Sequence, residues 1–343
     1  MILASAIEAP IALLSDRFSR VRIVSMALLV AAFALAACAL AEEAWLLSLG
    51  LALAGAASGV GCAAAEAELV STYPGGPSRA MSRWIAFGSV GDLLAPLVVA
   101  GVLALGASHR AALFGLALVM ALHGLRVARP VARTGRTVEP VHEAAAADAP
   151  PEPPLSVALR SAVAMPRLWW LLFATAACTL LDEIIVAFAA LRLHGDLHWP
   201  PPAVAATLAA CSFGALLGAL ATERLLSRFT PAALLCASAL AALVALAVFA
   251  TTHSAALAAS ALFVIGVAAA PHYPLAQAAA YELVPGRPGL VNALAQLFVL
   301  VDLASSLSVG LIAARYGLAA AILALGVQPL VILAVAFSLH RRA

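Results

Sequence analysis

The chain has 343 residues, of which 64% are apolar and 10% are charged, and its formal net charge is +2. Soluble domains usually carry about 25% charged residues, so this composition excludes an ordinary soluble fold. A net charge this close to zero gives no bulk attraction to nucleic acid, and we expect no nucleic-acid partner.

A short apolar segment opens the chain. Residues 1–14 contain Glu8 and Pro10 within the apolar run, and no basic residue precedes it, which is unlike a signal peptide. A bilayer core of about 30 Å requires about 20 helical residues, so this segment is too short to cross it. We expect it to be the second half of a helix whose start is missing.

Longer apolar stretches follow at regular intervals. In hydrocarbon every backbone polar group needs an internal partner, and apolar runs of this length satisfy that requirement as helices. We expect spanning helices at about 21–41, 45–70, 83–106, 110–127, 167–191, 203–222, 231–252, 255–280, 289–314 and 318–339. With the partial first segment this makes about 11 membrane segments, and predicts an all-α polytopic membrane protein.

The longest loop, at 128–166, divides these segments into five and six. Its stretch 138–154 is rich in proline, alanine and acidic residues, which is typical of a flexible linker. We therefore expect an N-terminal helical bundle at 1–127, a linker at 128–166 and a C-terminal helical bundle at 167–343.

The basic residues orient the segments. All 19 are arginines, and alternating spans place 16 of them on one side and only Arg110, Arg192 and Arg315 on the other. Cytoplasmic loops carry an excess of basic residues, so the arginine-rich side and the linker are expected to be cytoplasmic. The alanine-rich, lysine-free composition is associated with bacterial proteins of high genomic GC content, and we expect a bacterial plasma (inner) membrane.

The two halves repeat the same landmarks. Asp16 begins an Asp-Arg-x-x-Arg loop in the first half, and Glu223 begins a similar loop in the second. A Pro-Gly-x-Pro turn precedes the helix with Asp92 and another precedes the helix with Asp302. The intervals are 76 and 79 residues, which indicates two homologous bundles, as in transporters that move one half against the other.

Residues 8–22 (EAPIALLSDRFSRVR) resemble the signature of the major facilitator superfamily, Gly-x-x-x-Asp-Arg-x-Gly-Arg-Arg, which joins the family's second and third helices. Ala12 and Ser19 replace its two glycines, and Val21 intrudes before the last arginine. The resemblance implies a two-bundle fold without its first transmembrane helix, and the activity of a secondary transporter.

In the family this loop is a conformational latch on the cytoplasmic side. The resemblance assigns that role here to Asp16, Arg17, Arg20 and Arg22, and through the internal repeat to Glu223, Arg224 and Arg228. An ordinary positively charged cytoplasmic loop is the alternative reading.

The helix with Asp92 offers a second, weaker comparison. Gly91 and Pro96 match the Gly-Pro motif of proton–drug antiporters, but Ala95, Val99 and Ala100 stand where that motif has glycines. Export is therefore one option for the direction of transport, and it stays open.

Ionisable groups at membrane depth cost at least about 2.5–3.5 kcal/mol each, so they indicate a partner, a wet cavity or a function. The candidates for a proton or substrate pathway are Glu8, Asp92, Asp182, Glu183, His272 and Asp302. At 1.5 Å per residue, Asp92 lies roughly 13 Å and Asp302 roughly 20 Å into its span, near the middle of the membrane.

Each candidate has a plainer alternative. The acids could be hydrogen-bonded to a neighbouring helix, and His272, between Pro271 and Pro274, could be packed beside a kink. Neighbouring residues on a helix diverge by about 100°, so we expect only one of Asp182 and Glu183 to face a cavity and the other to face a partner.

These patterns favour a secondary active transporter of a small solute that is proton-coupled and works by alternating access. The alternative is a non-transporting or decayed protein of the same fold that acts as a sensor or scaffold. Neither H-E-x-x-H, G-x-S-x-G nor a P-loop occurs, so we expect no enzyme and no ATP-driven pump. The five cysteines have no CxxC spacing, and we expect no metal or cofactor, and a monomer in the bilayer.

Small residues at four-residue spacing predict close helix packing at Gly55 and Gly59, and again at Gly214 and Gly218.

Overall fold

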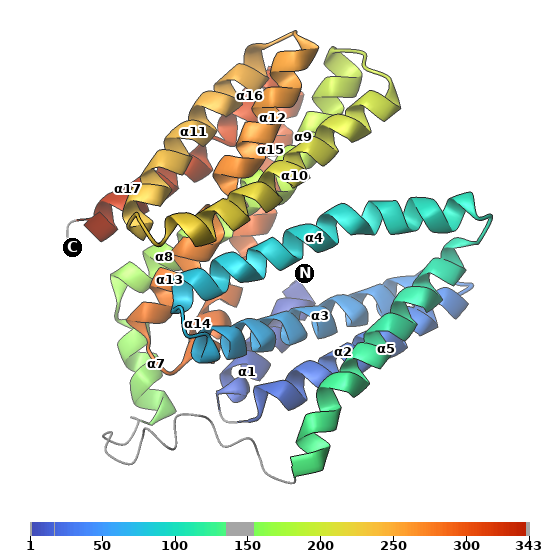
Figure 1. The fold of residues 1–343 in the computed structure, drawn as a ribbon, viewed down its shortest axis with the longest axis vertical. Coiled ribbons are helices and arrows are strands. Elements are labelled where there is room, and N and C mark those ends of the chain that lie inside the picture. Colours follow the sequence, from blue (N-terminus) through green and yellow to red (C-terminus); the bar gives the residue numbers. More distant parts are fainter. Residues whose placement is uncertain (1, 17, 135–153, 341–343) are drawn as a thin grey trace. The chain divides into compact units, whose positions relative to one another are not determined.

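The computed structural model describes residues 2–16, 18–134 and 154–340, and over these residues it contains helices and no strand (Figure 1). Nine helical segments in this part of the chain are long and apolar enough to cross a membrane. They coincide with nine expected spans, and the remaining full span is α4 (Pro77–Ala104), whose 28 residues extend about 42 Å. The prediction of an all-α polytopic fold is confirmed.

Internal contacts divide the chain into two compact units. Unit 1 comprises Met1–Pro74, Pro96–Met165 and Val284–Leu297, and unit 2 comprises Gly75–Ala95, Pro166–Leu283 and Phe298–Ala343. Each unit thus contains a segment from the other half of the sequence. The division predicted at residues 127 and 167 follows the linker and does not include this exchange.

In unit 1, α2 packs against both α3 and α5, and α14 packs against α1 and α3 (Figure 1). A small alanine-rich core joins α2, α3 and α5. Ser25 on α2 donates a hydrogen bond to the Gly124 carbonyl on α5 at 2.9 Å. The helices are α1 (Ile2–Ser15), α2 (Arg20–Leu40), α3 (Ala44–Thr72), α5 (His109–Thr134), α7 (Leu155–Val163) and α14 (Pro288–Ala295).

Unit 2 holds the first part of α4 and most of the second half of the chain. Its helices are α8 (Pro166–Ala177), η2 (Leu180–Ile184), α9 (Ile185–Leu191), η3 (Arg192–Asp196), α10 (Pro201–Leu225), α11 (Pro231–Thr251), α12 (Ala255–Ala269), α13 (His272–Leu283), α15 (Val299–Tyr316), α16 (Leu318–Ala324) and α17 (Val327–His340). Leu193, Phe249, Leu262, Ile265 and Ile322 form the centre of its core.

Several spans are interrupted. The 166–196 span contains two π-helical turns, η2 and η3, and the 255–283 span breaks between α12 and α13 at Pro271. Proline has no N–H to donate and clashes with the preceding turn, which explains this second break. A short 3₁₀ turn, η4 (Gln296–Phe298), separates α14 from α15, and a turn at residues 325–326 separates α16 from α17.

Many large apolar side chains point outward. Phe33, Phe87, Val244 and Phe337 are each more than 60% exposed, the largest at 73%. Contiguous exposed apolar surface is rare on soluble monomers, whereas lipid tails accept it without cost.

The pairing of α10 with α12 depends on glycine. A Cβ atom at Gly214 or Gly218 would overlap the carbonyl oxygen of Phe263 or Val267 on α12, and one at Gly266 would overlap the Cys211 carbonyl oxygen on α10. At Gly59 on α3 a Cβ atom would meet the carboxylate end of the Glu8 side chain rather than helix backbone, and Gly55 has open space around it within the described residues. The packing prediction is therefore confirmed for Gly214 and Gly218, and not for Gly55 and Gly59.

We predict that Gly214→Leu separates α10 from α12 and lowers the free energy of unfolding by about 1–3 kcal/mol, the usual cost of overpacking. Gly310→Leu is the matched control, because nothing in the described structure lies within 4 Å of a Cβ there. Thermal unfolding of both variants in detergent, followed by size-exclusion chromatography, measures the difference. Equal stability would show that the close α10–α12 contact is wrong.

Candidate functional site

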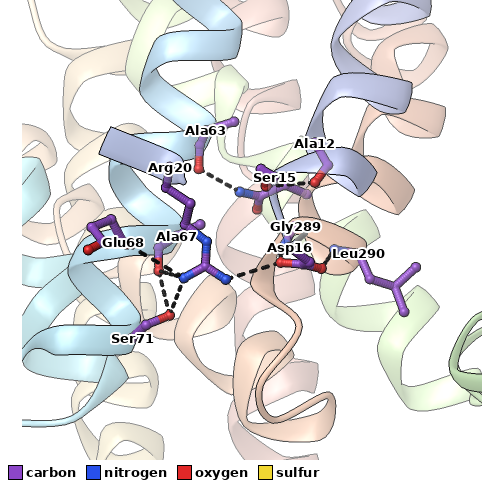
Figure 2. A network of polar contacts seen from close by, with 11 residues as sticks. Ala12, Ser15, Asp16, Arg20, Ala63, Ala67, Glu68, Ser71, Gly289 and Leu290 are labelled. Carbon is purple, nitrogen blue, oxygen red and sulfur yellow. Dashed lines mark hydrogen bonds and ion pairs between the residues drawn. The ribbon is translucent and has the colours of Figure 1, made fainter. Parts of the chain in front are cut away.

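The first candidate cluster lies where α14 begins in unit 1. The opening N–H groups of a helix have no partner within it, and Pro288 at the first position has no N–H at all. The Asp16 carboxylate accepts hydrogen bonds from the next two N–H groups, that of Gly289 at 2.9 Å and that of Leu290 at 3.0 Å (Figure 2). Gly289 makes this approach possible, since a Cβ atom there would overlap the Ala12 carbonyl oxygen.

Arg20 extends this cluster to α3. Its guanidinium donates to Asp16 at 3.1 Å, to the Ser71 hydroxyl at 2.7 Å and to the Ala67 carbonyl at 3.2 Å. Glu68 lies 3.9 Å away and adds a second ion pair. Figure 2 shows the arginine between the two carboxylates, so a single side chain joins the end of α1, the start of α2 and the end of α3.

The Asp16 side chain is 8% exposed. Burial has the largest influence on its pKa and raises it above the ordinary value, while the N–H groups of Gly289 and Leu290 and the charge of Arg20 act in the opposite direction. These three donors therefore favour the ionised carboxylate, and breaking the contact with α14 would favour its protonation.

The other predicted latch residues are placed differently. Arg17 lies outside the described residues. Arg22, Arg224 and Arg228 are exposed and form no ion pair with any described residue. Glu223 is half-buried near the end of α10. The structure thus brings together Asp16 and Arg20 of the predicted set.

The second candidate cluster lines a cavity of about 390 Å³ inside unit 2. Three of the predicted pathway acids, Asp92, Asp182 and Glu183, line it together. The lining residues come from α4 (Ile85, Gly88, Ser89, Asp92), from η2 and α9 (Leu181, Asp182, Glu183, Val186), from α10 (Cys211, Ser212, Ala215) and from α12, α13 and the break between them (Gly266, Ala269, Ala270, Tyr273).

The charge of this lining has one sign. Its described residues include three carboxylates and neither an arginine nor a histidine. A recess lined by charge of one sign, with low-dielectric walls, concentrates ions of the opposite sign. The cavity therefore favours cations, including protons.

Both Asp182 and Glu183 reach the cavity, where we expected only one of them to do so. The reason is the π-helical turn η2, in which the Ile185 N–H bonds to the Leu180 carbonyl five residues earlier. This wider turn changes the angle between successive side chains. Single π turns are frequent at functional sites, but no sequence pattern marked this one.

The remaining predicted pathway residues lie elsewhere, and none is among the described lining residues of the cavity. Asp302 on α15 accepts a hydrogen bond from the Thr179 hydroxyl at 3.0 Å. Glu8 on α1 accepts one from the Gln296 side chain at 2.8 Å. His272 is fully buried and its Nδ1 lies 3.1 Å from the Gln328 side-chain nitrogen.

The glutamines that contact Glu8 and His272 were not predicted from the sequence. Gln328 stands alone in an apolar run, and Gln296 has one polar neighbour, Asn292, four residues before it, so no known motif marks either glutamine. Their only signal is a polar side chain at membrane depth, the same signal that identified the acids.

We predict that Asp16→Ala exposes the first turn of α14. Loss of a helix N-cap costs about 0.5–2 kcal/mol, so amide hydrogen exchange at residues 289–292 should become roughly 2–30-fold faster. Arg22→Ala is the control and should leave this exchange unchanged, because Arg22 is exposed and unpaired within the described structure. Equal exchange in the two variants would contradict the capping role of Asp16.

Comparison with known proteins identifies the family of this chain. The model of the Major Facilitator Superfamily matches residues 1–309. A search of curated proteins found no significant match.

Three solved structures illustrate the shared fold. The E. coli fucose:proton symporter FucP is 17% identical, with a TM-score of 0.74 over 97% of this chain and 87% of that one. The human organic anion transporter MFSD10 (TETRAN) is 16% identical, with a TM-score of 0.72 over 98% and 81%. A bacterial homologue of the iron transporter ferroportin, in an outward-facing state, is 17% identical, with a TM-score of 0.69 over 98% and 87%.

At these identities the solved structures show the fold alone, whereas the family model covers most of the chain. The resemblance seen in residues 8–22 is therefore confirmed. The chain belongs to the Major Facilitator Superfamily and is a multi-pass membrane protein with the fold of its secondary transporters.

Proposed function

We propose that this protein is a proton-coupled secondary transporter of a small solute, which works by alternating access of two helical bundles and has no enzymatic activity. One observation carries the proposal: Asp92, Asp182 and Glu183 share a cavity of about 390 Å³ within unit 2.

Three carboxylates in one recess suit proton exchange. Each additional negative charge in a low-dielectric cavity makes the next ionisation harder, so neighbouring carboxylates share protons. A bound cation or a proton relieves the same repulsion. Loading and release of a proton at this cavity can therefore be coupled to binding and release of the solute.

The structural relatives support transport but leave the solute open. FucP is a fucose:proton symporter, and the other two relatives are named for organic anions and iron. The cation-favouring cavity supports a proton as the coupling ion. We propose export as the first direction to test, because Gly91 and Pro96 match the proton–drug antiporter motif in part.

We further propose that Asp16 and Arg20 form a conformational latch. Their contacts join α1, α2 and α3 to α14, a helix from the second half of the sequence. Formation and release of these bonds would favour one transport state over the other. For Arg17, Arg22, Glu223, Arg224 and Arg228 the latch role rests on the family resemblance.

The membrane we propose is a bacterial plasma membrane, in which the chain acts as a monomer with its arginine-rich side in the cytoplasm. The distribution of the 19 arginines supports this orientation.

Transport in vesicles tests the coupling. A screen of sugars, organic anions and organic cations first identifies a transported compound. We predict that a protonophore abolishes its accumulation, and that Asp92→Asn, Asp182→Asn and Glu183→Gln each reduce proton-driven transport about tenfold or more, because each removes a proton-binding group. Glu43→Gln is the control, since Glu43 is an exposed acid at the start of α3.

Transport that is indifferent to the protonophore and to all three substitutions would remove proton coupling from the proposal. A chain that moves no compound in the screen would favour the sensor or scaffold alternative.

A separate measurement tests the latch. We predict that Asp16→Asn lowers the maximal transport rate about tenfold, the effect of a 1.4 kcal/mol change in the balance of two states, and leaves solute affinity within about twofold. An unchanged rate would show that the Asp16 cap is structural only.

A further inference from the structure

We propose that Gln328, on a helix that contributes no described residue to the cavity, is a positioning residue for the carboxylates of the proposed proton site. The inference rests on the proposed function for its purpose, but its contacts and its test do not depend on the identity of the solute.

The first contact is with the π turn. Gln328 is fully buried, and its side-chain oxygen accepts a hydrogen bond from the Leu181 N–H at 2.7 Å. The same N–H lies 3.2 Å from the Cys178 carbonyl of its own helix, so the glutamine is the closer acceptor. Leu181 directly precedes Asp182 and Glu183, and all three residues line the cavity.

The second contact is with the break between α12 and α13. The Gln328 side-chain nitrogen lies 3.1 Å from His272 Nδ1, and His272 is fully buried at the start of α13. The next residue, Tyr273, lines the cavity. One glutamine therefore connects two interrupted spans, and each of those spans forms one wall of the cavity.

The chemistry fixes the orientation of this bridge. A backbone N–H can only donate, so the oxygen of the Gln328 amide must face Leu181 and its amino group must face His272. Nδ1 of His272 is then an acceptor, and the proton of the neutral ring is on Nε2. That atom is buried and has no hydrogen-bond partner among the described residues. The histidine thus holds the glutamine amide in one orientation.

The location of Gln328 follows from a third interruption. The turn between α16 and α17 at residues 325–326 places Gln328 in the first turn of α17, just before Pro329. α8, α13 and α17 pack against one another, so the three interrupted spans lie side by side. Without the glutamine, the Leu181 N–H would retain only the longer bond to Cys178, and the π turn would lose its external acceptor.

The role of Gln328 has a direct consequence for the two carboxylates next to the π turn. If Gln328 holds the π turn, its loss lets η2 relax toward an ordinary helix, and Asp182 and Glu183 no longer both face Asp92. Among the described residues, the other titratable groups near these two carboxylates are Asp92, Cys178, Cys211, Tyr273 and Asp302.

The test measures the carboxylates directly. The full-length protein in proteoliposomes is treated at one fixed pH with a hydrophobic carbodiimide, which reacts with the carboxyl groups that it reaches. Mass spectrometry then gives the labelling of Asp182 relative to that of Glu183, the labelling ratio. We expect Gln328→Leu to change this ratio about threefold or more, because a relaxed turn directs one of the two carboxylates away from the cavity.

Two variants sharpen the result. Gln328→Glu, in its neutral form, keeps a carbonyl acceptor for the Leu181 N–H and an O–H donor for His272 Nδ1, and should restore the wild-type labelling ratio. Thr222→Val removes a buried side-chain hydrogen bond of 2.7 Å that lies within α10, so it should leave the labelling ratio unchanged. If Gln328→Leu does not fold, Gln328→Met, which has nearly the same shape, replaces it.

An unchanged labelling ratio in the Leu or Met variant, even with reduced thermal stability, would overturn the positioning role and leave Gln328 as a structural residue. A changed ratio in a protein that shows no proton-driven transport would uphold the positioning and refute the proposed function.

Discussion

Backbone N–H groups that are buried away from water need acceptors, and neither hydrocarbon nor packed apolar side chains supply any. Regular helices meet this demand internally, but a helix start or a widened turn leaves donors without a partner. The described structure meets the demand twice with a side chain from a distant part of the sequence. Asp16 accepts the first N–H groups of α14, and Gln328 accepts the Leu181 N–H at the π turn. The first contact belongs to the Asp16–Arg20 cluster, and the second lies at the residue directly before Asp182 and Glu183 of the cavity.

The sequence predicted what depends on composition and regular spacing. Apolar length located the spanning helices, because each must cross the same thickness of hydrocarbon. The resemblance of residues 8–22 to the family signature pointed to Asp16 and Arg20, which form an ion pair where α1 ends and α2 begins. The cost of charge at membrane depth identified Asp92, Asp182 and Glu183, which share one cavity.

What the sequence did not predict depends on contacts between distant segments. The π turn at 180–184 resembles any other helical stretch in its residues, so the joint exposure of Asp182 and Glu183 to one cavity was missed. Gln328 was not predicted because a single glutamine in an apolar run forms no pattern with other polar residues. The exchange of α14 and the start of α4 between the two compact units follows from packing, which a linker-based division does not detect.

Gly289 has a consequence for natural variation. Its position beside the Ala12 carbonyl leaves no room for even a methyl group, and the same close approach lets Asp16 reach the start of α14. Every missense change of a glycine codon adds a side chain, so any such allele at this position would push α1 and α14 apart and weaken the cap. The most fragile residue of the first cluster is thus one that contributes no functional group of its own, and loss-of-function alleles should accumulate there as readily as at the charged residues it serves.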